Sequence, residues 1–170
     1  QSGYEKAYTT ALAGLAGAGM VHESAGMHGS LMGCILESFV IDNDMLGNIL
    51  RVVRGIEVTD ETLSLDVIAD VNVHGPGYYL GHAQTLSLMQ SEYRYPALSD
   101  RASPAAWEEQ GALDIEARAR NTVVQTLSTH YPDHISAKLD ARYRDRFNIL
   151  LPKNAMKPGD GRWTQAASIR

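Results

Sequence analysis

The chain has 170 residues, of which 44% are hydrophobic and 21% charged, and its formal net charge is −5. This length is sufficient for one domain with a sizeable core. A mildly acidic chain offers no basic stripe to neutralise phosphates, which argues against nucleic-acid binding. No apolar run approaches the roughly 20 residues that span a bilayer, so we expect no membrane segment.

The first predicted element is a helix from about Gly3 to Gly17, because Ser2 and Glu5 have the spacing of a capping box. The uncharged stretch from Ala7 to Val21 is rich in small residues, which is typical of a closely packed, buried helix.

A short run, Gly19–Glu23, is the best strand candidate in the chain, and a Gly/Ser-rich loop, Ser24–Ser30, follows it. The next segment, Leu31–Leu36, is apolar and fits either a strand or the start of a helix. It contains the single cysteine, Cys34, which we expect in the core rather than as a nucleophile. A lone cysteine forms no internal disulfide, which fits a reducing compartment and predicts a cytoplasmic protein.

The segment from Glu37 to Arg54 has clear helical periodicity, and Gly55 supplies its C-cap. Thr59 then caps a second amphipathic helix, which is broken by His74–Gly77. Another helix is predicted over Gly81–Glu92.

Further along, Ser103-Pro104 is a strong N-cap and N1 pair. It opens a helix that continues, with a bend at Gly111, to about His130. A last short helix is predicted over Ser136–Phe147. We divide the chain into a main part, residues 1–151, and an irregular tail, residues 152–170.

Helix, strand, loop and helix in succession are typical of an α/β fold. One or two strands cannot form a parallel sheet that is covered on both faces. The strand is therefore expected to belong to a sheet completed by other polypeptide. Because Gln1 is not an initiator methionine, we also expect the chain to be part of something longer. The alternative is an all-α domain in which Met20–Glu23 is a connector.

The most suggestive site is His22-Glu23, at the carboxyl end of the candidate strand, where side chains of parallel α/β folds meet substrate. Glu23 could hold a cation there, and His22 could donate, accept or ligate. The structural alternative is that both residues cap or pair with neighbouring helices. A zinc site of His22, Glu23 and His28 is a minor alternative, because no HExxH helix and no paired cysteines are present.

Two other segments carry weaker signals. Asp42-Asn43-Asp44 resembles part of a calcium loop but lacks the remaining ligands, and it is better interpreted as the first turns of a helix, with the carboxylates favouring the helix dipole. Tyr78 and Tyr79, after Pro76-Gly77, could face a quaternary ammonium by cation–π attraction, or be ordinary packing residues.

Five blocks in order and spacing resemble the trimethylamine methyltransferase family: Gln1–Lys6, Leu15–Ala18, Glu37–Asp44, Arg54–Leu63 and the helix that begins at Gly81-His82. The resemblance extends from the first residue to about Leu151. It implies the C-terminal part of a TIM (β/α)8 barrel, with the last strands and helices in this chain. It also implies transfer of a methyl group from a methylated amine to cobalt, with the cobalamin carried by a partner corrinoid protein.

Some members of this family carry pyrrolysine at a position that would lie just before Gln1. The stretch His22–Met27 departs from those members and resembles the branch that acts on glycine betaine and related quaternary amines. From their chemistry and their position, the candidate catalytic residues are Glu23, which would stabilise the ammonium, and His22. The substrate-binding candidates are Tyr78, Tyr79, His82 and Glu37, and a homo-oligomer is expected.

Two rival interpretations remain at this point. One keeps the fold but makes the chain a non-catalytic structural or regulatory piece. The other is a helical binding module unrelated to methyl transfer.

Overall fold

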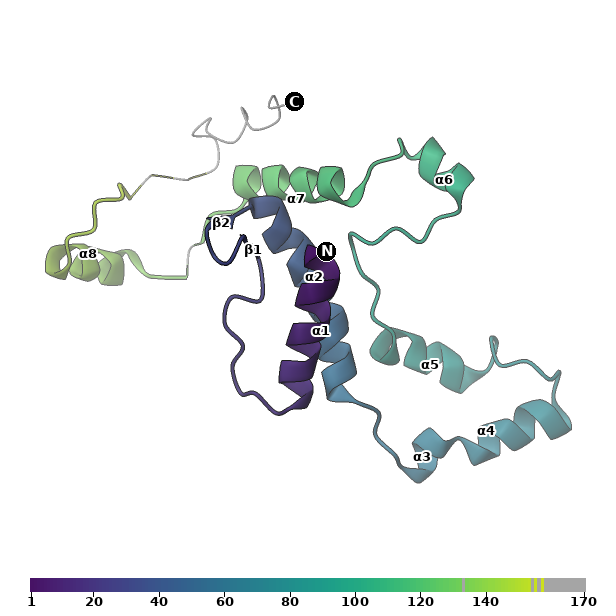
Figure 1. Ribbon diagram of the computed structural model, residues 1–170. Coiled ribbons are helices and arrows are strands. Elements are labelled where there is room, and N and C mark those ends of the chain that lie inside the picture. Colours follow the sequence, from purple (N-terminus) through teal and green to yellow (C-terminus); the bar gives the residue numbers. More distant parts are fainter. Residues whose placement is uncertain (133, 154, 156, 158–170) are drawn as a thin grey trace. The chain divides into compact units, whose positions relative to one another are not determined.

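The computed structural model describes residues 1–132, 134–153, 155 and 157 of the chain. The chain divides into two compact units, Gln1–Arg101 and Ala102–Arg170. Helices dominate both units (Figure 1), and the sheet of the described residues is a single antiparallel pair of two-residue strands. The helix-rich prediction is therefore confirmed, whereas the described residues contain no parallel strands.

The first helix, α1, spans Ser2–Leu15, close to the predicted range. The predicted capping box is wrong. Ser2 already lies inside the helix, so its hydroxyl is not at the N-cap, and the N-cap residue, Gln1, makes no side-chain cap. Instead the Gln1 amide donates to the Glu5 carboxylate at 2.7 Å. The prediction of a buried helix is also wrong, because none of the residues of α1 is buried.

The predicted strand over Gly19–Glu23 is wrong. Val21 is irregular, and His22 and Glu23 form a turn in which Glu23 has a φ of 55°. The Ser24 hydroxyl donates to the Val21 carbonyl at 3.3 Å, which closes this turn locally. The segment is a connector, as in the all-α alternative.

The two strands lie further along, in the segment predicted to be loop and ambiguous structure. They are β1, Met27–His28, and β2, Gly33–Cys34, and Met27 pairs with Cys34. Gly29, Ser30 and Leu31, between the strands, all have positive φ. Cys34 is exposed rather than in the core, because a two-stranded hairpin has no second layer to cover it.

Helix α2 spans Leu36–Arg54 and lies alongside α1 (Figure 1), which confirms the periodicity-based prediction. Gly55 follows it with a φ of 72°, in the conformation that glycine adopts without strain. The two helices approach closely where Gly14 of α1 faces Val53 of α2: a Cβ at Gly14 would lie 2.7 Å from the Val53 Cγ2 atom. Gly14 of α1 therefore serves close packing against α2.

The helix predicted after Thr59 is divided into α3, Asp60–Leu63, α4, Leu65–Ala69, and the π-helix η1, Asp70–His74. Thr59 caps α3 as predicted, in a reciprocal capping box with Thr62. Ser64 adopts the left-handed conformation and interrupts the helix. Helix α5, Ala83–Glu92, follows the predicted break at His74–Gly77. Its last residue, Glu92, forms ion pairs with Arg51 and Arg54 of α2.

The second unit contains α6, Pro104–Glu109, α7, Ile115–Thr129, and α8, Ala137–Arg146. Ser103 caps α6 as the sequence predicts, and Ser136, predicted as the first residue of the last helix, is the N-cap of α8. Gly111 ends the first helix rather than bending it, because positive φ values at Gly111 and Ala112 leave the helical region. Most of the predicted irregular tail, residues 152–170, lies outside the described residues.

Asp114 restarts the interrupted helix, since its side chain accepts the Ala117 backbone N–H at 2.8 Å. We expect Asp114→Ala to lower the free energy of unfolding by about 1 kcal/mol, the usual cost of losing such a cap. Asp114→Asn keeps the acceptor oxygen and should stay within a few tenths of wild type. Urea titration of both variants checks this, and equal losses for the two would contradict it.

Burial is sparse throughout the described residues. The buried apolar residues are Ile49, Val71 and Leu98 in the first unit and Ala119, Val123 and Ala155 in the second. On α1 the side chains of Tyr4, Tyr8, Leu12 and Leu15 are more than half exposed. In the part of the chain that is described, no helix combines the length and apolar character needed to cross a membrane.

Candidate functional site

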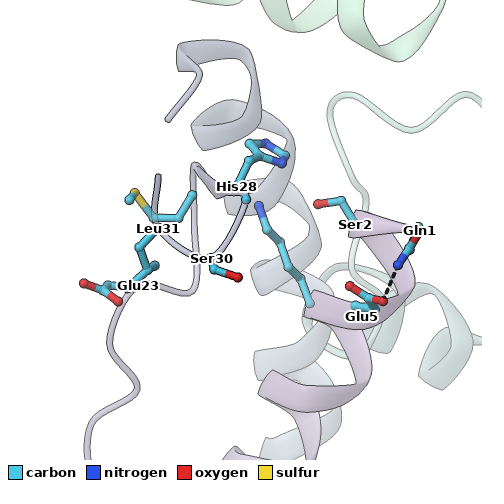
Figure 2. Close-up of a pocket in the computed structure, with 10 residues that line it drawn as sticks. Gln1, Ser2, Glu5, Glu23, His28, Ser30 and Leu31 are labelled. Atoms are coloured by element: carbon cyan, nitrogen blue, oxygen red, sulfur yellow. Dashed lines mark hydrogen bonds between the residues drawn. The ribbon is translucent and has the colours of Figure 1, made fainter. Parts of the chain in front are cut away.

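A cavity of about 440 Å³ lies between the first turn of α1 and the loop that leads into and through the hairpin. Figure 2 shows Gln1, Ser2 and Glu5 on the α1 side and Glu23, His28, Ser30 and Leu31 on the loop side. Lys6, Met27 and Gly29 complete the lining. The cavity thus joins the beginning of the chain to a segment about 20 residues further along.

The cavity has an excess of negative charge. Its one lysine, Lys6, forms an ion pair of 2.6 Å with Asp42 of α2, which neutralises the lysine charge. Glu5 accepts a hydrogen bond from the Gln1 amide, a neutral donor. Within the described part of the chain neither Glu5 nor Glu23 has a basic partner, so two carboxylates are left to attract a cation.

His28 is another lining residue that contacts α2. It lies on β1, is half-buried, and its Nε2 is 2.6 Å from the Ser38 hydroxyl in the first turns of α2. This hydrogen bond fixes the imidazole ring at the edge of the cavity while the other ring nitrogen keeps its own hydrogen-bonding capacity.

His22 and Glu23 remain close together but do not project from a strand. Both are exposed. His22 lines a smaller hollow of about 170 Å³ with Thr9 and Thr10 of α1, and Glu23 lines both this hollow and the main cavity. The structure therefore places Glu23 at the cavity and His22 at its rim.

The remaining predicted site residues do not line this cavity. Tyr79 accepts a hydrogen bond from the Asn72 amide, and Tyr78 is 60% exposed in the same loop. His82 is the N-cap of α5 and accepts the Gln84 backbone N–H at 3.1 Å. Its Nε2 lies 3.6 Å from an Asp70 carboxylate oxygen. Glu37 is half-buried in the first turn of α2.

Sequence reasoning missed Glu5, Ser30 and the buried carboxylate of Asp42. It assigned Glu5 to a capping box, and it placed Asp42 in the first turns of a helix, where a carboxylate favours the dipole. Asp42 does lie in the second turn of α2, and it accepts hydrogen bonds from Lys6 and Gly26 there, which the sequence did not predict. No spacing in the sequence indicates that Glu5 and Glu23 line one cavity.

Among the described residues no three His, Cys, Asp or Glu side chains come together as a set that could hold a metal ion. On the sequence alone, His28 was a candidate zinc ligand together with His22 and Glu23. In the structure His28 is hydrogen-bonded to Ser38. The arrangement is suited to holding a small organic cation by charge and hydrogen bonds.

Comparison with known proteins places the chain in an enzyme family. The family model described as trimethylamine methyltransferase (MTTB) matches residues 1–148. The trimethylamine methyltransferase MttB of Methanosarcina thermophila is 35% identical over 139 residues, which are 82% of this chain and 28% of that protein.

The glycine betaine methyltransferase of Desulfitobacterium hafniense (strain Y51) is 29% identical over 143 residues, covering 84% of this chain and 29% of its own length. The trimethylamine methyltransferase MttB of Desulfitobacterium hafniense (strain DSM 10664 / DCB-2) is 32% identical over 144 residues, with coverages of 85% and 28%. The chain therefore spans less than a third of the length of these relatives, and it matches them over most of its own. By the extent of the family match, the chain belongs to the trimethylamine methyltransferase family.

Proposed function

We propose that the protein containing this chain transfers a methyl group from a methylated amine to the cobalt of a corrinoid protein, which carries the cobalamin. The observation that carries the proposal is the family match over residues 1–148, together with relatives named for trimethylamine and glycine betaine. The family match also removes the interpretation as an unrelated binding module.

The chain would perform this reaction only as part of the whole protein. We propose a TIM barrel for that protein, with the barrel strands supplied by polypeptide outside the described residues and α1, α2 and the hairpin packed against them. The chain spans 28% of the length of its Methanosarcina thermophila relative. The exposed apolar side chains of α1 are suited to burial against such additional polypeptide.

A quaternary ammonium such as glycine betaine is the substrate that we favour. Its nitrogen already carries a full positive charge, so a neutral tertiary amine can leave when the methyl carbon is attacked. The bond between methyl carbon and nitrogen breaks, its electron pair stays on nitrogen, and the methyl group bonds to the nucleophilic cobalt. A tertiary amine would need protonation or covalent activation before the same step.

We assign the ammonium group to the cavity between α1 and the loop, near Glu23 and Glu5. The hydroxyls of Ser2 and Ser30 and the imidazole of His28 line the same cavity and are suited to the carboxylate end of glycine betaine. In this arrangement Glu23 holds the substrate rather than taking part in proton transfer. His22, at the rim, would contact the substrate or the docking corrinoid protein.

The charge on nitrogen disappears as the methyl group leaves, so a carboxylate beside it stabilises the bound substrate more than the transition state. Such an interaction lowers KM and does not raise kcat. We therefore expect Glu23→Gln to raise the KM for glycine betaine about tenfold, the effect of about 1.4 kcal/mol from one screened charge. The kcat should stay the same or rise slightly.

The assay mixes the complete protein with a Co(I) corrinoid protein and follows the absorbance of the methylated corrinoid. Glu109→Gln serves as the control, because Glu109 is exposed on α6 and does not line the cavity. No methylated corrinoid from either glycine betaine or trimethylamine would instead favour a non-catalytic member of the family. A loss of kcat at constant KM in Glu23→Gln would contradict the role given to this residue.

A further inference from the structure

Both walls of the cavity are attached to one buried carboxylate. Asp42, on α2, is only 4% exposed. Its Oδ2 atom accepts a hydrogen bond from the Lys6 ammonium of α1 at 2.6 Å and another from the Gly26 backbone N–H at 2.8 Å. Lys6 belongs to one wall of the cavity, and Gly26 lies between Glu23 and His28 of the other.

The two hydrogen bonds to the Asp42 carboxylate are strong, because hydrogen bonds to ionised groups are shorter and stronger than neutral ones and the site is shielded from water. The Lys6 side chain is 17% exposed and that of Asp42 is 6% exposed. Loss of the negative charge would leave a poorly hydrated ammonium without its partner and the Gly26 N–H without its acceptor. Few other contacts fix the loop: the Ile35 N–H donates to the Gly26 carbonyl, and His28 reaches Ser38.

We propose that Asp42 is a positioning residue for the amine site. It sets the separation of the α1 wall from the loop wall, and so the distance between the Glu5 and Glu23 carboxylates that receive the ammonium. Asp42 does not line the cavity and does not touch the substrate. The inference rests on the proposed function, which supplies the methylated amine as the ligand. The attachment of the loop by Asp42 can be tested without that ligand.

The chain supplies a matched control two residues away. Asp44 lies on the same helix and is 6% exposed, and its carboxylate accepts the backbone N–H groups of Ala97 and Leu98 at 3.0 and 3.1 Å. Arg94 lies 3.6 Å from it. Asp42 and Asp44 therefore agree in helix, burial, charge and type of partner, but they anchor different loops.

The experiment compares Asp42→Asn with Asp44→Asn in the complete protein. Asparagine keeps the shape but removes the charge. At Asp42 one oxygen accepts both hydrogen bonds, so the amide oxygen of asparagine can accept them only as weaker, neutral bonds and the ion pair with Lys6 is lost. At Asp44 the two bonds use different oxygens, so the NH₂ group replaces one acceptor. In Asp42→Asn, we expect amide hydrogen exchange of residues 22–28 to accelerate at least tenfold, and the KM for glycine betaine to rise about tenfold with kcat within twofold. In Asp44→Asn, faster exchange should be confined to residues 94–98, with KM unchanged.

Asp42→Glu is the second variant, because it keeps the negative charge that pairs with the Lys6 ammonium. Its KM should lie between wild type and Asp42→Asn. Equal KM values for the Asp42 and Asp44 variants, or unchanged exchange at residues 22–28 in Asp42→Asn, would overturn the inference. A wild-type protein that methylates no corrinoid would refute the proposed function alone, since the exchange comparison still decides whether Asp42 holds the loop.

Discussion

Replacement of Gly26 by alanine is expected to lower the free energy of unfolding by about 3 kcal/mol, the largest effect of any single substitution considered. Gly26 is buried with a φ of 78°, and a Cβ there would lie 2.4 Å from the Phe39 ring. The left-handed conformation costs an alanine about 1 kcal/mol, and an overpacked contact costs about 1–3 kcal/mol. Urea titration monitored by circular dichroism measures the loss.

Two further variants measure the conformational cost and the steric cost of Gly26→Ala separately. Gly29 also has a positive φ, 57°, but the nearest atom to its Cβ position is 3.9 Å away. Gly29→Ala should therefore cost only about 1 kcal/mol. When Phe39 is alanine in both compared proteins, Gly26→Ala should cost only the conformational part, because the ring that the new methyl would meet is absent. Equal losses for Gly26→Ala and Gly29→Ala would contradict the close contact.

The second large effect concerns the contact between α1 and α2, where we expect replacement of a glycine by alanine to destabilise the protein rather than stabilise it. In an open helix position, glycine to alanine stabilises by about 1 kcal/mol. At Gly14 the new methyl would meet the Val53 Cγ2 atom at 2.7 Å, and the branched valine side chain cannot turn away easily. We expect Gly14→Ala to destabilise the protein by about 1 kcal/mol in wild type, and to stabilise it by a similar amount when Val53 is alanine.

The resulting coupling energy, about 2 kcal/mol, is measured by a double-mutant cycle of unfolding free energies. Gly3→Ala, on the same helix with no atom within 4 Å of the Cβ position, is the control and should not destabilise the protein. A coupling near zero would show that the two helices separate at this point or adjust without cost.

Sequence reasoning predicted the elements whose causes are local. Thr59 and Ser103 were each expected as caps, and each side chain accepts the backbone N–H three residues on. Such a bond depends only on neighbouring residues. Helix α2 was predicted because its apolar residues recur with the helical period, and Gly55 ends it as expected.

Sequence reasoning failed where structure depends on distant partners. The apolar pair Met20-Val21 has a strand-like composition, but no strand of the described residues pairs with it, and both residues are exposed. The true strands, at Met27 and Gly33, are two residues long and contain glycine, which is a poor strand former. Their pairing depends on a turn with three successive positive φ values, which composition alone does not indicate.

In the candidate site, too, features that depend on neighbouring residues differ from features that depend on distant contacts. Glu23 was predicted as a cation-binding residue from its chemistry and from its place at the end of an expected strand. Residues 22–23 form a turn instead, and Glu23 lines the cavity from this turn. The opposite wall was not predicted, because Asp42 of a third element links α1 to the loop through hydrogen bonds to Lys6 and Gly26. A charged residue within a helix is expected on the solvent face, and nothing in the pattern marks Asp42 or Asp44 as buried anchors.

Hydrogen–deuterium exchange of the complete protein, with and without saturating glycine betaine, tests the assignment of the ammonium site most directly. If the ammonium binds between α1 and the loop, we expect slower exchange in residues 1–6 and 22–31 and unchanged exchange in the loop of Tyr78 and Tyr79. Protection confined to residues 78–82, or no protection anywhere in this chain while the protein methylates its corrinoid partner, would contradict it.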